Sequence, residues 1–300
     1  MRKKIAYILL FSMLIGQDSV IAGQLKEDIS YYNKPFSSNS PWNQSIIERY
    51  SYNGREELAY IESIMPNNIT INSNTWSIPV YKAVKEDPIR KIFISEINDS
   101  VNVKMPDGIK EAGGTDGHLA VFSPDSKFIH EFYKFKNNKA KIYKKVKADG
   151  LGVATNRYQN IGTRAYGGSS VGGLLRSWEV RDKNSIQHAL ALAISKQYLK
   201  EGFIKPATLE DSFSNSKYSG FIPMGSHITL KAGINYEEML SNRLAIKIAN
   251  ALYDYGGYVV DSGGSNKIII YAEPGLDNKI IRDATIELKK ILQYLVVVRD

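Results

Sequence analysis

The sequence predicts an α+β fold that combines a mainly antiparallel β-sheet, of the jelly-roll or sandwich type, with a few packed helices. Short runs of β-branched and aromatic residues alternate with Asn, Asp, Gly and Pro in the first part of the chain, as in ITINSNTWSIPVYKAV, and such runs are typical of strands joined by turns. The clearest helical pattern lies near the C-terminus, over residues 236–255. The sequence contains no internal repeat and no linker, so one domain with sheet and helices is the simplest interpretation.

The first 23 residues have the three parts of a secretory signal peptide. A basic start at residues 2–4 precedes an apolar run over residues 5–15, and small residues follow at Ala22 and Gly23. The apolar run is too short to cross a bilayer as a helix. We therefore expect cleavage near Ala22 or Gly23, a single secreted or periplasmic domain over residues 24–300, and no stable membrane insertion after cleavage. An uncleaved N-terminal anchor is the alternative.

The composition of the mature chain indicates which classes of partner it can bind. The formal net charge of +8 becomes about +6 when the three basic residues and one acid of the leader are removed. The basic residues are not clustered as in nucleic-acid-binding proteins, so no nucleic-acid partner is expected, whereas a mild positive excess suits an acidic polysaccharide. Cysteine is absent, so no disulfide supports the fold. Nineteen tyrosines and three tryptophans supply rings that suit sugar stacking and ordinary sheet faces alike.

The first half of the mature chain is predicted to contain an irregular arm, one helix and several strands. Pro35 and Pro41 exclude a helix in the arm, and Trp42 is expected to pin it onto the domain. The spacing of apolar residues in GREELAYIESIM predicts a helix over residues 54–65, and residues 67–104 read as strands.

Two hairpins are predicted next. Residues 118–122 and 128–135 form the arms of the first, with a turn at Pro-Asp-Ser between them, and Asn137-Asn138 can turn the chain into a further strand, AKIYKKV. Because side chains alternate faces along a strand, Asp116 and His118 are expected on one face, with Glu131 near them on the partner strand.

The second half begins with the segment from Gly162 to Leu190 and ends in the helical third. LLRSWEV is expected to be a strand, whereas residues 184–199 fit a helix or a strand equally well. The last third predicts a strand at HITLKA, a helix over residues 236–255 that buries Leu244 and Ile248, strands at YVVD and KIIIYAE, a helix over 278–295 and a terminal strand at VVV.

The segment 162–190 is the candidate functional region. It holds five glycines, two adjacent serines and three arginines within 29 residues. Each glycine costs backbone entropy and offers no side chain to a core, so such a density is tolerated where the backbone turns sharply or closely approaches something. A Gly-rich connection with surface charges is the plain alternative. The functional interpretation is a cleft in which Arg176, Glu179 and His188 face a polar ligand together with Asp116 and His118.

Four residues are the candidate catalytic groups: Asp116, His118, Glu179 and His188. Both histidines have a structural alternative, in which each is a buried group satisfied by hydrogen bonds. No HxH, HExxH or similar spacing predicts a metal site, and no motif identifies a cofactor. Ser169 and Ser170 are expected to be turn residues, since no nucleophile elbow surrounds them.

The candidate substrate-binding residues are Arg176, Gln187, Tyr166 and Glu131. Elimination on a uronate needs a cation, a base and an acid, which Arg176, His188 and Tyr166 can supply. Hydrolysis needs two carboxylates across the glycosidic bond, for which Asp116 pairs with Glu179 or Glu131. The sequence does not choose between the two reactions.

The chain resembles a set of secreted bacterial proteins of unassigned function over nearly its whole mature length. The segments that carry this resemblance are PFSSNSPWNQSI, GGTDGHLAVFSP, YGGSSVGGLLRSWEV, IQHALALAI, IPMGSHITL and ALYDYGGYVVDSGG. A local similarity also links RSWEV, IQH and LKAGINY to strand motifs of jelly-roll alginate lyases. That similarity implies that Arg176 and Gln187 bind uronate and that His188 acts as the base. The first two motifs lie closer together here, Asn235-Tyr236 replaces the expected tyrosine, and the C-terminal helices do not belong to that fold.

Two classes of function follow from the sequence. The first is an exported carbohydrate-active enzyme, a lyase or hydrolase that cleaves a polysaccharide, expected to be acidic. The second is a non-catalytic secreted protein that binds glycans or another surface protein through its aromatic residues. Convergence of the candidate catalytic side chains in one cleft would favour the enzyme.

Overall fold

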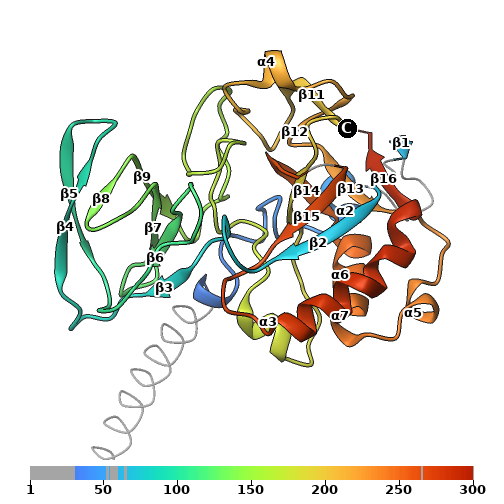
Figure 1. The fold of residues 1–300 in the computed structure, drawn as a ribbon, viewed down its shortest axis with the longest axis horizontal. Coiled ribbons are helices and arrows are strands. Elements are labelled where there is room, and N and C mark those ends of the chain that lie inside the picture. Colours follow the sequence, from blue (N-terminus) through green and yellow to red (C-terminus); the bar gives the residue numbers. More distant parts are fainter. Residues whose placement is uncertain (1–30, 52–53, 55–59, 64–65, 265, 300) are drawn as a thin grey trace, which may run out of the picture.

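The computed structural model describes residues 31–299, except residues 52–53, 55–59, 64–65 and 265. The expected signal peptide lies outside the described residues. The described part is a mixed α+β structure, mostly sheet with a few helices, which confirms the predicted class (Figure 1). The jelly-roll or sandwich expectation is not confirmed, because the strands divide among sheets of seven, four, three and two strands.

The seven-stranded sheet forms the centre of the larger lobe. Its strands are β1 (Tyr60–Ser63), β2 (Asn68–Asn72), β10 (Leu190–Ile194), β13 (His227–Leu230), β14 (Gly257–Ser262), β15 (Lys267–Tyr271) and β16 (Leu295–Val298). Their order is β1-β16-β13-β14-β10-β15-β2. The β10–β14 and β15–β2 pairs are parallel and the others antiparallel. The helix expected over residues 54–65 is wrong in its described part, because Tyr60–Ser63 pairs with β16 as an edge strand.

Strand β10 settles the ambiguity over residues 184–199 in favour of a strand. All five residues of LALAI are buried. The strand lies between β14 and β15, and both of its faces are covered, so an unbroken apolar run is required instead of alternation.

The smaller lobe contains two small sheets. A four-stranded sheet has the order β3-β6-β7-β9 and a three-stranded sheet the order β5-β4-β8. Their bounds are β3 Val80–Lys82, β4 Ile89–Ile94, β5 Asp99–Lys104, β6 Leu119–Phe122, β7 Phe128–Tyr133, β8 Lys139–Ala140 and β9 Ile142–Lys147. Both predicted hairpins are present, because β7 pairs antiparallel with β6 and with β9. Strands β11 (Leu199–Phe203) and β12 (Ile222–Met224) form the remaining two-stranded sheet in the larger lobe.

Strand β6 joins two apolar clusters. Leu119 and Val121 belong to the cluster that lies between the two small sheets. Ala120 and Phe122 point the other way and belong to the main core, which also contains the residues of β10. Alternation along one strand therefore connects the small sheets to the rest of the described structure.

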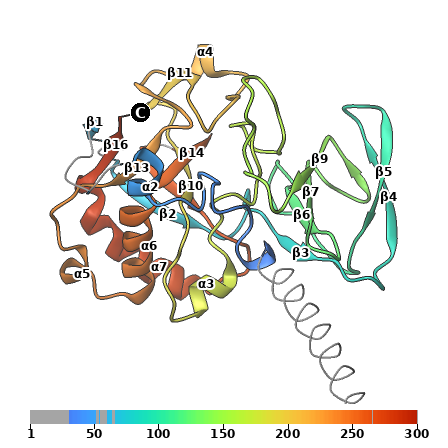
Figure 2. The same cartoon turned by 180° about the vertical axis from the view of Figure 1, so that it is seen from behind.

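The helices lie mainly in the larger lobe. They are α2 (Ile46–Tyr50), α3 (Ser177–Arg181), α4 (Ser214–Lys217), α5 (Tyr236–Met239), α6 (Arg243–Asp254) and α7 (Asn278–Leu288), followed by the 3₁₀ helix η2 (Lys289–Tyr294). Helices α6 and α7 lie side by side along the seven-stranded sheet (Figures 1 and 2). No helix among the described residues is long and apolar enough to cross a membrane.

Two helix predictions need correction. The helix expected over residues 236–255 is divided, because Leu240 is extended and the Asn242 side chain then caps α6 by accepting from two backbone N–H groups. Leu244 and Ile248 are buried as predicted. Residues 177–181, expected in a strand, form helix α3, since the Glu179 carboxylate accepts from the Arg176 N–H at 2.8 Å and fixes the first turn.

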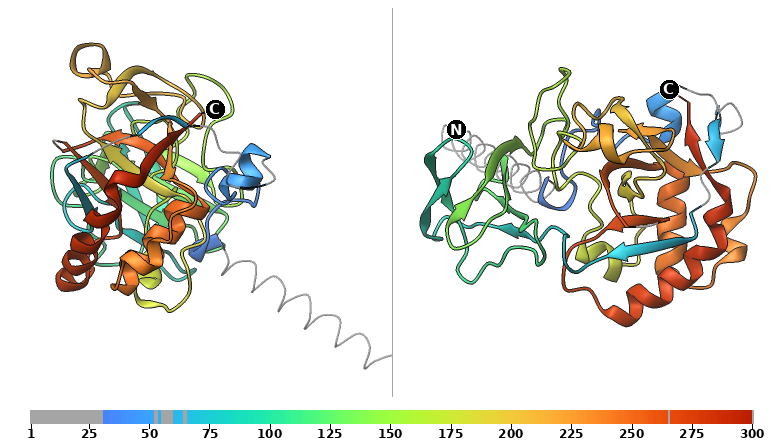
Figure 3. Two further views of the ribbon diagram at one scale, coloured as in Figure 1. Left: turned by 90° about the vertical axis from the view of Figure 1, so that its right-hand side faces the viewer. Right: turned by 45° about the horizontal axis from the view of Figure 1, so that its top comes forward.

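The N-terminal arm is held as the sequence predicts. Trp42 is 1% exposed, and its ring meets Tyr166 and Tyr258 edge-on at centroid distances of 6.0 and 5.3 Å. The Gly-rich segment that follows β9 lies between the two lobes (Figures 1 and 3). This position lets it contact both the small sheets and the seven-stranded sheet.

Candidate functional site

A polar cavity of about 540 Å³ lies between the four-stranded and the seven-stranded sheets. Its walls come from the start of β6, the end of β7, the Gly-rich segment, the loop before α4 and the end of β14. The polar side chains that line it are Asp116, His118, Tyr133, Asn160, Thr163, Arg164, Glu210, Asp211, Ser212, Asp261 and Ser262. We call this the interlobe cavity.

A β-bulge places Asp261 in this cavity. The register of β14 against β10 shifts between Val259 and Asp261, so Val260 has no partner in the ladder. Its carbonyl accepts from the Tyr166 N–H at 3.2 Å, which ties the Gly-rich segment to β14. Bulges commonly redirect the next side chain at a sheet's end, and here the redirected carboxylate is Asp261.

Asp261 is held by three groups, one of which is the Ser262 N–H, which donates to Oδ1 at 2.9 Å. Arg164 Nη1 lies 3.1 Å from Asp261 Oδ2, and the Tyr271 hydroxyl donates to the same oxygen at 3.2 Å. Burial raises the pKa of Asp261 to about 6, although Arg164 opposes the rise; Asp211 and Asp116 add to it. A carboxyl group with such a pKa can donate a proton near neutral pH.

Arg164 is a buried cation with donors to spare. Its guanidinium lies 3.7 Å from the centroid of the Tyr271 ring, a cation–π contact. Within the described structure its Nε and Nη2 atoms have no hydrogen-bond partner. Burying unpaired donors of a charged group is costly, so this arrangement suits a residue that completes its bonds with a ligand.

His118 lies in the same wall as a neutral base. It is 2% exposed, and its ring centroid lies 5.3 Å from that of Tyr133. Burial, reinforced by Arg164, holds the pKa of His118 well below its ordinary value. Among the described residues its Nδ1 atom has no partner. The neutral ring therefore keeps an unpaired nitrogen buried in the cavity wall.

Carboxylates dominate the charge of the interlobe cavity. Asp116, Glu210, Asp211 and Asp261 line it, against the single cation Arg164. The Tyr218 hydroxyl donates to Asp211, and burial, with a smaller contribution from this bond, raises the pKa of Tyr218. The cavity is thus acidic, and it favours a neutral or cationic group over an anionic one.

Glu131 fixes the wall formed by the Gly-rich segment. Its buried carboxylate accepts from the N–H groups of Ser170, at 3.0 and 3.1 Å, and of Thr163, at 3.2 Å, and from the Ser169 hydroxyl. Burial raises the pKa of Glu131, although these hydrogen bonds favour the charged form. Its predicted role in substrate binding stays a prediction: the side chain faces the loop and is not among the residues that line the cavity, because β7 turns this residue toward the main core.

Two glycines are required by close approach around the cavity. A Cβ on Gly162 would lie 1.8 Å from the Gly168 carbonyl oxygen. Gly117, between Asp116 and His118, has a φ of +48°, and a Cβ there would lie 3.0 Å from the Phe135 carbonyl oxygen. Gly162 thus lets the Gly-rich segment fold back on itself beside Thr163 and Arg164, which line the cavity.

Three other candidate site residues, Arg176, Glu179 and His188, lie in a separate buried network. Arg176 Nε donates to Glu273 at 2.7 Å and its Nη1 to the Tyr32 carbonyl at 2.7 Å. His188 Nε2 lies 3.0 Å from Glu179 Oε1, and its Nδ1 lies 2.9 Å from the Ala189 carbonyl oxygen. All these polar groups are partnered, so the plain structural interpretation fits them.

The hollow beside this network is too small for a sugar. Arg176 and His188 border a space of about 20 Å³, which holds about one water molecule. Tyr166 is 1% exposed, and its hydroxyl donates to the Ser169 carbonyl at 2.9 Å. Gln187 is exposed beside His188.

The expectation of one cleft for the five residues Asp116, His118, Arg176, Glu179 and His188 is therefore corrected. The first two line the interlobe cavity, and the last three lie in the buried network. The physical reason is local: helix α3 turns Glu179 inward, where its carboxylate contacts His188. Within the described ranges, no group of three or more His, Asp or Glu residues is arranged to hold a metal ion.

Sequence reasoning missed Arg164, Asp211, Asp261 and Tyr271. Arg164 carried a signal, since it lies among the glycines of GTRAYGG. Asp261 carried another, because it ends a buried strand and precedes Ser-Gly-Gly. Asp211 lies in a polar loop with no comparable mark.

The chain was compared with models of protein families, with curated proteins and with solved structures. None of the three comparisons gave a match.

Proposed function

We propose that this protein is an exported glycoside hydrolase whose active site is the interlobe cavity. The supporting observation is Asp261, a largely buried carboxyl whose side chain is 19% exposed and whose pKa is about 6, in a cavity that other carboxylates share. Hydrolysis of a glycosidic bond needs two carboxyl groups, one protonated and one charged. Burial favours the protonated form of Asp261, and Asp116 in the same cavity provides the second carboxyl group.

In this proposal Asp261 is the general acid. It donates its proton to the glycosidic oxygen as the bond from that oxygen to the sugar carbon breaks. Arg164 and Tyr271 hold the carboxyl in place and stabilise the charge left after proton transfer. A water molecule attacks the sugar carbon, and the Asp116 carboxylate accepts its proton. Asp116 suits this role because it is half-exposed at the cavity, where its Oδ1 accepts a hydrogen bond from Thr115 Oγ1 at 3.2 Å.

Hydrolysis is favoured over elimination by the charge of the cavity. Elimination needs a cation that neutralises the uronate carboxylate. Arg164 is the single cation that lines the cavity, and its charge is already offset by Asp261, although two of its donors remain unpaired among the described residues. Three further carboxylates would repel a uronate at this position. The sugar unit at the cleavage point is therefore neutral or carries an amino group, while acidic groups of the polymer lie elsewhere.

The test uses the purified protein with neutral, amino-sugar and uronic-acid polysaccharides between pH 4 and pH 8. We expect new reducing ends without the ultraviolet absorbance of unsaturated uronates, and rates that fall above about pH 6 as Asp261 loses its proton. Asp261→Asn and Asp116→Asn should each lose at least a hundredfold in rate. Asp149→Asn, at an exposed carboxylate outside the cavity lining, is the matched control.

Three outcomes would overturn the proposal. Unsaturated products would show elimination. Full activity in Asp261→Asn would remove the acid from the mechanism. Binding of a polysaccharide without any cleavage across the panel would favour the non-catalytic alternative.

A further inference from the structure

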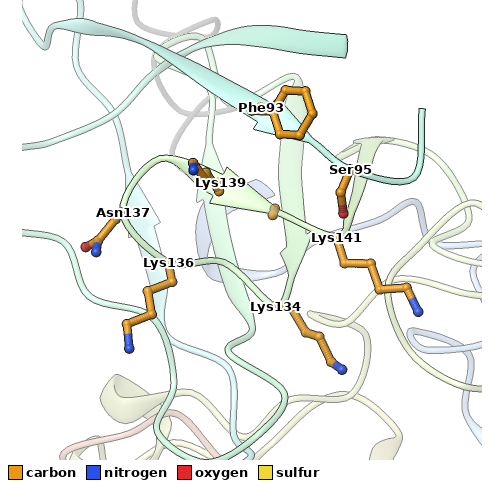
Figure 4. Close-up of a pocket in the computed structure, with 8 residues that line it drawn as sticks. Phe93, Ser95, Lys134, Lys136, Asn137, Lys139 and Lys141 are labelled. Atoms are coloured by element: carbon orange, nitrogen blue, oxygen red, sulfur yellow. The ribbon is translucent and has the colours of Figure 1, made fainter. Parts of the chain in front are cut away.

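A second hollow, lined by lysines, lies at the tip of the smaller lobe. It holds about 570 Å³ and is bordered by Phe93 and Ser95 at the end of β4 and by the turn between β7 and β9 (Figure 4). We call it the lysine groove. Its lining residues are Phe93, Ser95, Lys134, Lys136, Asn137, Lys139, Ala140 and Lys141.

The turn places the backbones of two of the lysines opposite each other. Lys136 and Lys139 exchange backbone hydrogen bonds of 2.8 and 3.0 Å around Asn137-Asn138, whose φ values are +50° and +58°. This is a two-residue hairpin turn, and the residues that flank it are a directly opposed pair. Like charges opposed in this way destabilise a hairpin.

No acidic residue offsets this charge within the groove. None of its eight lining residues is acidic, and all four lysines are exposed. Among the described residues none of the four forms an ion pair. Uncompensated charge at a cost in stability is typical of a binding site.

The other lining groups suit a sugar. Phe93 is 38% exposed, although it is a large apolar side chain, and it lies beside Lys139 because β4 and β8 pair in parallel at these residues. An exposed ring beside cations can stack on a sugar face while the ammonium groups bind its acidic substituents. Ser95 and Asn137 add hydrogen-bonding groups for hydroxyls.

We propose that the lysine groove binds an acidic polysaccharide through its carboxylate or sulfate groups. A nucleic acid fits less well, because single strands are bound on a series of aromatic platforms and the groove has one ring. Two of the groove's lysines are adjacent in sequence to residues of the interlobe cavity, since Tyr133 and Ile142 line the cavity and Lys134 and Lys141 line the groove. Binding here does not depend on cleavage in the cavity.

The test measures binding of polygalacturonate, a sulfated polysaccharide, neutral dextran and single-stranded DNA by calorimetry at 50 and 300 mM salt. The key variant is Lys136→Gln with Lys139→Gln. The matched control, Lys200→Gln with Lys289→Gln, removes the same charge from exposed sites on β11 and η2. Asp261→Asn is included because it leaves the groove intact.

We expect both acidic polysaccharides to bind, dextran not to bind, and high salt to weaken the affinity at least tenfold, because salt screens exposed charges. The groove variant should lose at least tenfold in affinity, with an unchanged or raised melting temperature, and the control less than twofold. Asp261→Asn should bind as the wild type does, even if it cleaves nothing. Equal losses in groove and control variants, or tighter binding of DNA than of either polysaccharide, would overturn the proposal.

Discussion

Replacing Asp261 with Asn should change how stability depends on pH. Burial raises the pKa of this carboxyl from 3.8 to about 6 in the folded protein. A raised pKa means that the folded state holds the proton more tightly than the unfolded state, so stability is lost as pH rises from 3.8 to about 6. At 1.36 kcal/mol per pH unit the full loss is about 3 kcal/mol, of which about 2 kcal/mol falls between pH 4 and pH 7.

The assay is urea unfolding of the wild type, Asp261→Asn and the control Asp149→Asn at pH 4 and pH 7. Asn cannot ionise, so the free energy of unfolding of the variant should rise relative to the wild type by about 2 kcal/mol between the two pH values. A constant offset between the curves is expected from Arg164, which loses its partner at either pH. Parallel pH dependence in wild type and Asp261→Asn would refute the assignment of a raised pKa to Asp261.

Three further substitutions test the network around the cavity and the core. Glu131→Gln should cost about 1–3 kcal/mol in urea unfolding, since donors such as the Ser170 N–H lose a charged acceptor. His188→Ala should cost about 3–5 kcal/mol, because it breaks a buried pair with Glu179. The pKa of Glu179 is lowered and that of His188 is raised in the folded protein. The loss of stability should therefore be largest between pH 4.5 and 6.5 and should shrink at lower and higher pH. A loss that is independent of pH would contradict the pairing. Leu244→Asp should lower the melting temperature by at least 10 °C, as it places a charge in the core.

The sequence predicted local structure best where a periodic apolar stripe or a specific turn residue determines the conformation. Helix α6 shows its apolar stripe in the sequence and buries it, and the Asn137-Asn138 turn follows from the residues that tolerate a positive φ. Residues 177–181 were misjudged because a strand and a short capped helix share the same composition. The capping contact from Glu179 to the Arg176 N–H decides between them, and it is visible only in three dimensions.

The candidate site was half predictable for a related reason. Asp116 and His118 stand beside glycines in the sequence, and the close approach that requires Gly117 also brings them to the cavity. Arg176, Glu179 and His188 stand beside glycines as well, but they satisfy one another in the interior. A dense glycine segment thus marks close packing, and packing serves a buried network as readily as a cavity wall.

The state of the buried polar groups is what separates the two clusters. In the network around Glu179 and His188 both ring nitrogens have partners, so nothing is left for a ligand. In the interlobe cavity Arg164 retains unpaired donors and His118 an unpaired Nδ1 among the described residues, although both are buried. Unpaired buried polar atoms cost stability that packing must offset. Their presence beside a carboxyl with a pKa near 6 is the physical reason to assign proton transfer to this cavity.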